Sequence, residues 1–193
     1  MSVRHAWLTF TATGRPLPHR LFDDPAPWQE TLLAEHRTWY GADVAPQVSG
    51  AFVLQYLLQV PAQTAATAAG VGMRCTALAG LTFILGDHSV PKAAEIGLVA
   101  PLAGGLDERL ARAERDYREV AAPLAEHYRS PRPMSTQQRL GMVEDMWAQA
   151  RRAVRSGSGL VDTEEPRRLS CCLIYALPGC VECAGCPRQG TGR

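Results

Sequence analysis

The chain has 193 residues, of which 46% are hydrophobic and 20% are charged, with 20 Lys and Arg against 19 Asp and Glu. This composition is typical of a folded globular protein rather than a disordered one, and the length suffices for one domain with its own core. A net charge of +1 argues against general binding to nucleic acid or to anionic membranes.

The first twenty residues contain no continuous apolar run of the length found in signal peptides. The most apolar stretch, residues 51–60, is interrupted by Gln55 and Gln59 and is too short to cross a bilayer. We therefore expect a cytoplasmic protein without a membrane span. Structural disulfides are rare in the cytosol, so clustered cysteines in such a protein favour metal or redox chemistry.

Two helices are expected in the first seventy residues. Residues 25–40 follow a plausible capping aspartate, Asp23 or Asp24, begin with Pro25 and then repeat large apolar residues at helical spacing. Residues 46–69 are mostly apolar and end in an Ala-rich stretch, and we expect Pro61 to kink or divide this second helix. Three tryptophans fit apolar helix faces and are expected in the core: Trp28, Trp39 and Trp147.

Two short strands and a third helix are expected next. Residues 78–85 and 95–99 read as strands, and the residues between them include Gly86, Asp87, Ser89 and Pro91, which favour a turn. These strands therefore predict an antiparallel hairpin. The helix expected after Gly105 repeats apolar residues three and four positions apart, and Pro123 is expected to break it near its end.

The last predicted helix begins at Ser135 and Gln138, which have the spacing of a capping box, and ends in the Ser- and Gly-rich stretch 156–159. Together these elements predict an α+β fold. Residues 1–159 form a mainly helical body with a small antiparallel hairpin or sheet. Residues 160–193 form a C-terminal cysteine-rich segment that binds a cluster and packs on the same domain.

Five of the six cysteines lie near the C-terminus, where two patterns overlap. One is an adjacent pair, ten intervening residues and then Cys-x-x-Cys: Cys171, Cys172, Cys183 and Cys186. The other is Cys180-x-x-Cys183-x-x-Cys186 followed by proline, which with Cys171 or Cys172 as fourth ligand predicts a [4Fe-4S] cluster. Thiolates suit both zinc and iron–sulfur clusters. Adjacent side chains of an extended chain point to opposite faces, so the pair favours a site with two irons over a single zinc.

The first pattern begins within Arg167-Arg168-Leu-Ser-Cys-Cys-Leu-Ile-Tyr-Ala-Leu-Pro-Gly and ends in Cys183-Ala-Gly-Cys186-Pro187. It resembles the C-terminal signature of the FhuF-type ferric-siderophore reductases. The resemblance implies that Cys171, Cys172, Cys183 and Cys186 bind a [2Fe-2S] cluster, with no catalytic residue beyond it. It implies an oxidoreductase that passes one electron to iron(III) in a hydroxamate-type siderophore. Cys180 departs from this pattern.

Three functions stay open at this point: siderophore reduction, an iron–sulfur electron carrier or redox or iron sensor without a siderophore substrate, and a zinc-stabilised structural module. A siderophore-sized cavity beside the cluster would favour the first, and a convex cluster surface the second. The glycines of Gly70-Val-Gly72 follow a helix rather than a strand, so no nucleotide fingerprint is predicted. Electrons are therefore expected from a separate donor protein or reductant.

The sequence gives weaker indications about the remaining candidate residues. Arg167 and Arg168 precede the cysteine pair, where they are expected either to raise the cluster potential, to contact the ferric complex or to be solvated. Cys75 is expected to be a buried structural thiol. Asp87 and His88 fall in the predicted turn and are expected at the surface.

Overall fold

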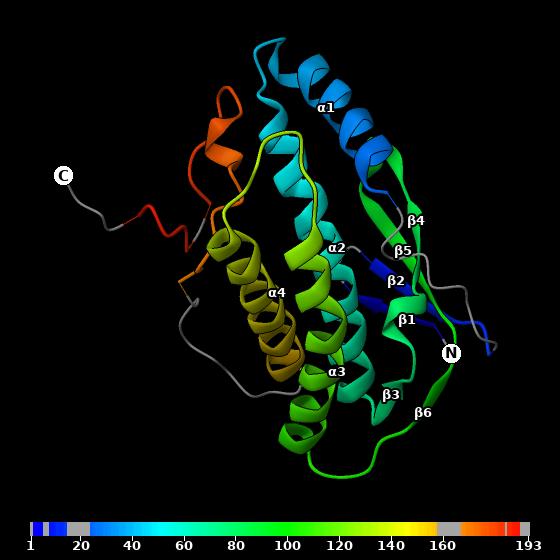
Figure 1. The fold of residues 1–193 in the computed structure, drawn as a ribbon. Helices are drawn as coiled ribbons and strands as arrows, with labels where there is room; N and C mark the ends of the chain where they lie inside the picture. The colour runs from blue at the N-terminus through cyan, green and yellow to red at the C-terminus, as the bar shows by residue number, and fades with distance from the viewer. Residues whose placement is uncertain (1, 6–7, 15–23, 158–166, 184, 190–193) are drawn as a thin grey trace.

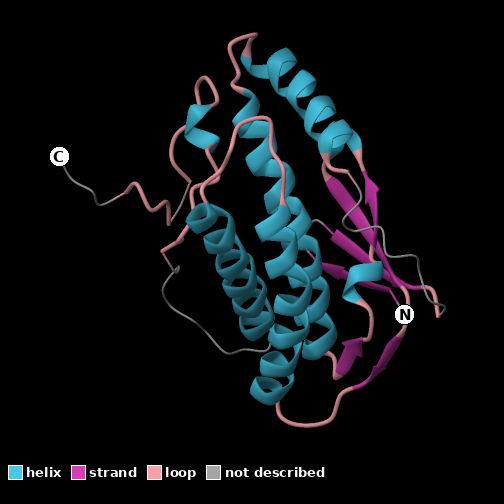
Figure 2. Cartoon of the chain, in the orientation of Figure 1, coloured by secondary structure: helices cyan, strands magenta, loops and turns pink. Residues whose placement is uncertain are grey.

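The computed structural model describes residues 2–5, 8–14, 24–157, 167–183 and 185–189. Within these residues the chain forms four helices and two small sheets, as Figures 1 and 2 show. The helices are α1 (Ala26–Tyr40), α2 (Pro46–Gly70), α3 (Leu106–His127) and α4 (Thr136–Gly157). The strands are β1 (Ser2–His5), β2 (Leu8–Ala12), β3 (Met73–Cys75), β4 (Thr82–Leu85), β5 (Pro91–Ile96) and β6 (Val99–Pro101). The predicted mainly helical α+β class is confirmed.

Helix α2 is the centre of the molecule. It packs against α1, α3 and α4 and against strands β3 and β5, so the other helices and the sheets surround it (Figure 1). Most of its side chains are buried, including Leu54 and Leu58 at 0% exposure. A helix that is apolar on all sides is stable only in such a position, which explains why its sequence shows little amphipathic rhythm. Helices α3 and α4 have polar outer faces and cover one side of it.

The larger sheet has the strand order β1-β2-β5-β4, and the smaller sheet pairs β3 with β6. Strands β4 and β5 form the predicted antiparallel hairpin. The strand bounds differ from the prediction in three respects. The residues predicted as one strand, 95–99, are divided between the end of β5 at Ile96 and the start of β6 at Val99. The first half of 78–85 is a short 3-10 turn over Leu78–Gly80, and β5 begins at Pro91 rather than at residue 95. A proline is tolerated as the first residue of a strand because its missing N–H costs no ladder hydrogen bond there.

The N-terminal strands β1 and β2 make the larger sheet mixed rather than wholly antiparallel. Strand β2 pairs in parallel with β5, so that Thr9 lies opposite Ala93. Leu8 and Phe10 alternate with threonines and are buried at 0% and 4% exposure. This is the alternation expected of a strand with one face on the core.

Both prolines expected to interrupt helices leave them continuous. Pro61 lies inside α2, which is not divided, and α3 runs past Pro123 to His127. A proline removes one intrahelical hydrogen bond, but packing of the flanking turns can outweigh that loss. Pro61 is itself buried, and the residues that follow Pro123, Leu124 and Ala125, are buried as well.

The three tryptophans differ in burial. Trp147 is 3% exposed and stacks on Tyr117, as expected of a core residue. Trp28 is half-buried and donates its indole N–H to the carbonyl of Ser89 at 2.9 Å. Trp39 is 45% exposed, so its predicted place in the core is wrong. It lies at the C-terminal end of α1, where its ring packs edge-on against exposed His88 instead.

Candidate metal centre

The cysteine-rich segment, residues 167–189, lies against the N-terminal half of α4 and near α2 (orange to red in Figure 1). It has little regular structure, with one short 3-10 turn over Ile174–Ala176 (Figure 2). Its first residues follow one face of α4, where positions three and four apart lie in line. Gln138 donates from Nε2 to the carbonyl of Cys171 at 2.9 Å. A Cβ placed on Gly141 would lie 3.4 Å from the backbone of Leu169, so the chain passes close to the helix there.

Asp145 is the main polar anchor of this segment. Its carboxylate accepts the backbone N–H of Leu169 at 2.7 Å and that of Ser170 at 2.9 Å, and also the hydroxyl of Ser170. Arg168 adds an ion pair, with Nε 3.5 Å from Oδ2. The Asp145 side chain is only 5% exposed. A buried carboxylate is stable only with such partners, so Asp145 ties the start of the segment to α4.

Two bends bring the cysteines together. Leu173 has a left-handed backbone at φ 63°, which turns the chain directly after the adjacent cysteine pair. At the other end, the N–H of Cys186 bonds to the carbonyl of Cys183 at 3.0 Å and closes a tight turn. The N–H of Arg168 bonds to the carbonyl of Gly185 at 2.8 Å. This last bond joins the two ends of the segment and sets the Cys-x-x-Cys turn beside the adjacent pair.

The four predicted ligands meet as two pairs of thiols. The Sγ atoms of Cys172 and Cys183 are 3.7 Å apart. Cys171 lies near Cys186, whose thiol contributes to raising the pKa of Cys171. Cys172 and Cys186 are 5% and 2% exposed. Across the part of the chain that the structure describes, no three His, Cys, Asp or Glu side chains converge as they would around one metal ion.

Burial alters the acidity of these thiols. It raises the pKa of Cys171, and it raises the pKa of Cys183 to about 11, an effect that nearby Cys172 strengthens and Arg168 opposes. Protonated thiols must lose their protons to bind a metal, so metal uptake at this site releases protons.

Cys180 lies apart from the two thiol pairs. It packs against a small apolar cluster formed by Val44, Val48 and Leu177, which connects the segment to the start of α2. Its N–H bonds to the carbonyl of Leu177 at 3.0 Å. Cys180 therefore acts as an apolar side chain that helps to hold the loop around Leu177 against the start of α2.

The two arginines before the cysteine pair have different environments. Arg167 is exposed and donates to the carbonyl of Pro187 at 2.8 Å. The Arg168 side chain is 17% exposed, and its Nη1 lies 3.8 Å from Sγ of Cys183. Burial alone would lower the pKa of Arg168, but Cys172, Asp145 and Cys183 outweigh it and raise that pKa. The guanidinium is therefore a permanent positive charge at the thiol.

A groove of about 830 Å³ runs along α4 to the cysteine-rich segment. Cys183, Arg167 and Arg168 lie at the segment's end of this groove, and Gln55 of α2 contributes to its wall. Its volume falls within the range of small-molecule sites, roughly 300–1,000 Å³. A ligand bound in it would lie beside a predicted cluster ligand.

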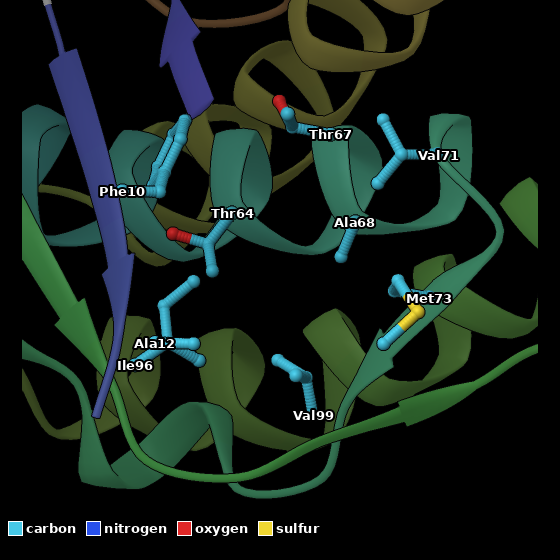
Figure 3. A pocket seen from close by; sticks show the side chains of 9 residues that line it. All are labelled: Phe10, Ala12, Thr64, Thr67, Ala68, Val71, Met73, Ile96 and Val99. Atoms are coloured by element: carbon cyan, nitrogen blue, oxygen red, sulfur yellow. The ribbon is translucent and has the colours of Figure 1, made fainter. Parts of the chain in front are cut away.

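A second, much smaller cavity of about 40 Å³ lies between the C-terminal half of α2 and strands β2, β3, β5 and β6 (Figure 3). Two threonines, Thr64 and Thr67, are the polar residues among the nine that line it, and Thr64 already donates its hydroxyl to the carbonyl of Val60 at 2.7 Å. None of the nine has an ionisable side chain, so the cavity offers no acid–base or metal chemistry.

The other candidate residues behave as expected. Cys75 is 5% exposed in the core, and burial raises the pKa of its thiol to about 11. Asp87 and His88 are exposed in the turn between β4 and β5.

Of the helices that the structure describes, none combines the length and apolar character needed to cross a membrane. The anchor role of Asp145 was not predicted, although an aspartate between the core residues Met142 and Met146 is a usable signal.

Comparison with known families identifies the segment. A family model described as the FhuF 2Fe-2S C-terminal domain matches residues 168–188, which include all five clustered cysteines. The resemblance drawn from the cysteine spacing is therefore confirmed over this stretch, and the chain carries an iron–sulfur domain of the 2Fe-2S type. No curated protein and no solved structure matches the chain.

Proposed function

We propose that this chain is a one-electron oxidoreductase that reduces siderophore-bound iron(III), with a [2Fe-2S] cluster held by Cys171, Cys172, Cys183 and Cys186. The observation that carries the proposal is the match of residues 168–188 to a 2Fe-2S domain of the FhuF family. In that stretch Cys172 contacts Cys183, and Cys171 lies near Cys186. The groove beside Cys183 supports the choice of a reductase over an electron carrier.

The donor set fits such a cluster. Two thiolates bound to one tetrahedral metal at about 2.3 Å lie roughly 3.8 Å apart. The Sγ atoms of Cys172 and Cys183 are 3.7 Å apart, and Cys171 with Cys186 supplies a second pair. Two pairs match two irons with two protein ligands each. Cys180 remains outside this ligand set because it packs in an apolar cluster.

When bound, a [2Fe-2S] cluster takes up and gives up one electron. The cluster would thereby supply an electron, taken from a separate donor protein or reductant, to the substrate iron(III), which would become iron(II). No covalent bond to the protein forms or breaks, so no nucleophile or general base is required. Iron(II) is softer and less charged than iron(III), and the hard oxygen donors of a hydroxamate bind it more weakly. Reduction therefore releases the iron.

The protein residues around the site have three tasks. Burial of Cys172 and Cys186 excludes water from the sulfur atoms. Asp145 and Gln138 hold the backbone of the cysteine-rich segment on α4. The groove admits a small complex beside Cys183, which shortens the path for electron transfer.

The proposal also assigns separate roles to two parts of the chain. In this proposal residues 1–159 are the body that supports the site and residues 160–193 are the segment that supplies the cluster ligands, although residues 160–166, 184 and 190–193 lie outside the described part of the chain. We assign the protein to the cytoplasm, where a reductant is at hand and thiols stay reduced.

The test is to mix the anaerobically reduced holoprotein with a ferric trihydroxamate and a ferrous-iron chelator in a stopped-flow instrument. Reoxidation of the cluster in step with iron(II) capture, one iron per electron, is the expected result. The gallium(III) complex of the same hydroxamate is the matched control, because gallium(III) has similar size and charge but accepts no electron. A cluster that stays reduced with the ferric complex would indicate a carrier or sensor. A colourless protein that contains zinc would indicate a structural module.

A further inference from the structure

The four predicted ligands do not have equivalent surroundings. Arg168 places Nη1 3.8 Å from Sγ of Cys183, the partner of Cys172. On the other pair, Gln138 reaches only the backbone carbonyl of Cys171. A cationic N–H donor at one sulfur stabilises negative charge there and leaves the distant sulfurs less affected.

The guanidinium is fixed in this place by two further partners. Its Nη2 lies 3.2 Å from Oε1 of Gln55 on α2, and its Nε lies 3.5 Å from Oδ2 of Asp145 on α4. The Asp145 carboxylate also accepts hydrogen bonds from the N–H of Leu169 and from the N–H and hydroxyl of Ser170. Its negative charge is therefore shared among these three donors and Arg168. The side chain is thus pinned between two helices with its outer nitrogens toward Cys183 and Gln55.

We propose that Arg168 makes the iron held by Cys172 and Cys183 the one that accepts the electron, and that it raises the midpoint potential of the cluster. Gln55 and Asp145 are positioning residues that hold the guanidinium at the sulfur. This inference rests on the [2Fe-2S] cluster of the proposed function. One electron from the external donor converts one of two iron(III) ions to iron(II). The positive charge of Arg168 favours that change at the nearer iron because reduction makes the cluster more negative.

The same asymmetry determines from which side of the cluster the electron leaves. Cys183 and Arg168 both lie at the groove along α4. The iron that Arg168 makes easier to reduce is therefore the iron nearest to a complex bound in the groove. The electron would leave the cluster through Cys183, while the buried Cys186 belongs to the iron that stays oxidised.

The first test is a redox titration of the full-length holoprotein, followed by EPR and visible absorption. Arg168→Gln is expected to shift the midpoint potential to lower values and Arg168→Lys to shift it less, since lysine keeps the charge but loses the planar donor geometry. Arg167→Gln is the matched control, because Arg167 is exposed and bonds to a backbone carbonyl. The midpoint potential of the cluster in the Arg167→Gln protein should equal that of the wild type. An Arg168→Gln protein with an intact cluster and an unchanged potential would overturn the inference.

The second test needs no variant. In the reduced wild-type protein, the β-protons of the four cysteine ligands have paramagnetically shifted NMR signals whose temperature dependence differs between the two irons. We expect Cys172 and Cys183 to carry the signature of the iron(II) site, assigned by selective isotope labelling. Iron(II) on the Cys171–Cys186 pair would overturn the inference and leave the proposed function intact. A wild-type protein without a [2Fe-2S] cluster would overturn both.

Discussion

The helical body and the cysteine-rich segment are held together by different forces. The body buries a continuous apolar core around α2, with side chains such as Leu54 and Leu58 fully removed from water. The segment has one short 3-10 turn, and its backbone is fixed by side chains of α4, chiefly Asp145 and Gln138. Hydrophobic burial is non-directional, whereas hydrogen bonds to a carboxylate fix position and orientation.

This difference suits the two roles. A core that depends on buried area tolerates no large loss of volume, but apolar contacts impose no preferred direction on the groups that make them. A metal site needs its sulfur atoms at defined distances, which demands specific polar contacts and, finally, the metal itself. We therefore expect substitutions in the two regions to change different observables.

The largest expected effect is loss of the cluster when a ligand is removed. Cys172→Ser should abolish nearly all visible absorption and iron content, because the buried thiolate has no substitute in the Cys172–Cys183 pair. Far-UV circular dichroism should stay close to that of the wild type, since the helices belong to the body. Cys180→Ser is the matched control and should keep a normal spectrum. Loss of the cluster in Cys180→Ser and not in Cys172→Ser would favour the alternative ligand set.

Substitution in the body should change stability and leave the cluster spectrum intact. Leu58→Ala removes a fully buried side chain of α2 and should lower the free energy of unfolding by about 3 kcal/mol. Denaturant unfolding followed by circular dichroism measures this loss, and the visible spectrum of the folded variant reports the cluster. A folded Leu58→Ala protein with a disturbed cluster would contradict the separation between the two regions.

Removal of the polar anchor should loosen the segment with a smaller effect on the body. Asp145→Ala leaves the N–H groups of Leu169 and Ser170 without their acceptor and removes the ion-pair partner of Arg168. The loss should be about 2 kcal/mol, seen as faster amide hydrogen exchange at Leu169 and Ser170. Asp107→Ala is the control, because that carboxylate pairs with Arg155 while 79% exposed, and such pairs contribute little. Unchanged exchange in Asp145→Ala would refute the anchor role.

The smallest expected effect concerns Cys75, the cysteine of the body. Burial raises the pKa of its thiol from 9.0 to about 11, so the folded state favours the protonated form. The stability that this provides is complete below pH 9 and is lost as the pH rises toward 11. At pH 8 iodoacetamide should modify Cys75 far more slowly than Cys180, as peptide mass spectrometry can show. Equal rates in the folded protein would mean that Cys75 is accessible.

The sequence predicted those elements whose signals are local. Helix α1 and the β4–β5 hairpin follow from side-chain spacing and turn residues within short windows. The bounds of α2 also agree, but its continuity through Pro61 depends on packing from several neighbours, which no local pattern records. The parallel pairing of β2 with β5 joins residues more than eighty positions apart and is likewise invisible to such patterns. The alternation of Leu8 and Phe10 with threonines would have revealed β2 itself.

The cysteine spacing predicted the iron–sulfur domain, which the match over residues 168–188 confirms. The ligand set itself stays a prediction: Cys172 and Cys183 are in contact, while Cys180 packs in an apolar cluster. The contacts that hold them were not predictable, because Asp145 and Gln55 come from two different helices that meet the segment only in three dimensions. Arg168 was one of two adjacent arginines, and only the tertiary structure distinguishes it from Arg167.

The most direct test of the central claim is the metal and sulfide content of the protein purified without oxygen, combined with Mössbauer spectroscopy of the iron. We expect two irons and two sulfides per chain, with spectra of two tetrahedral sulfur-ligated iron(III) sites that reduction by one electron converts to one iron(III) and one iron(II). Zinc without sulfide, or four irons with four sulfides, would contradict the account of Cys171, Cys172, Cys183 and Cys186 as ligands of a one-electron [2Fe-2S] centre.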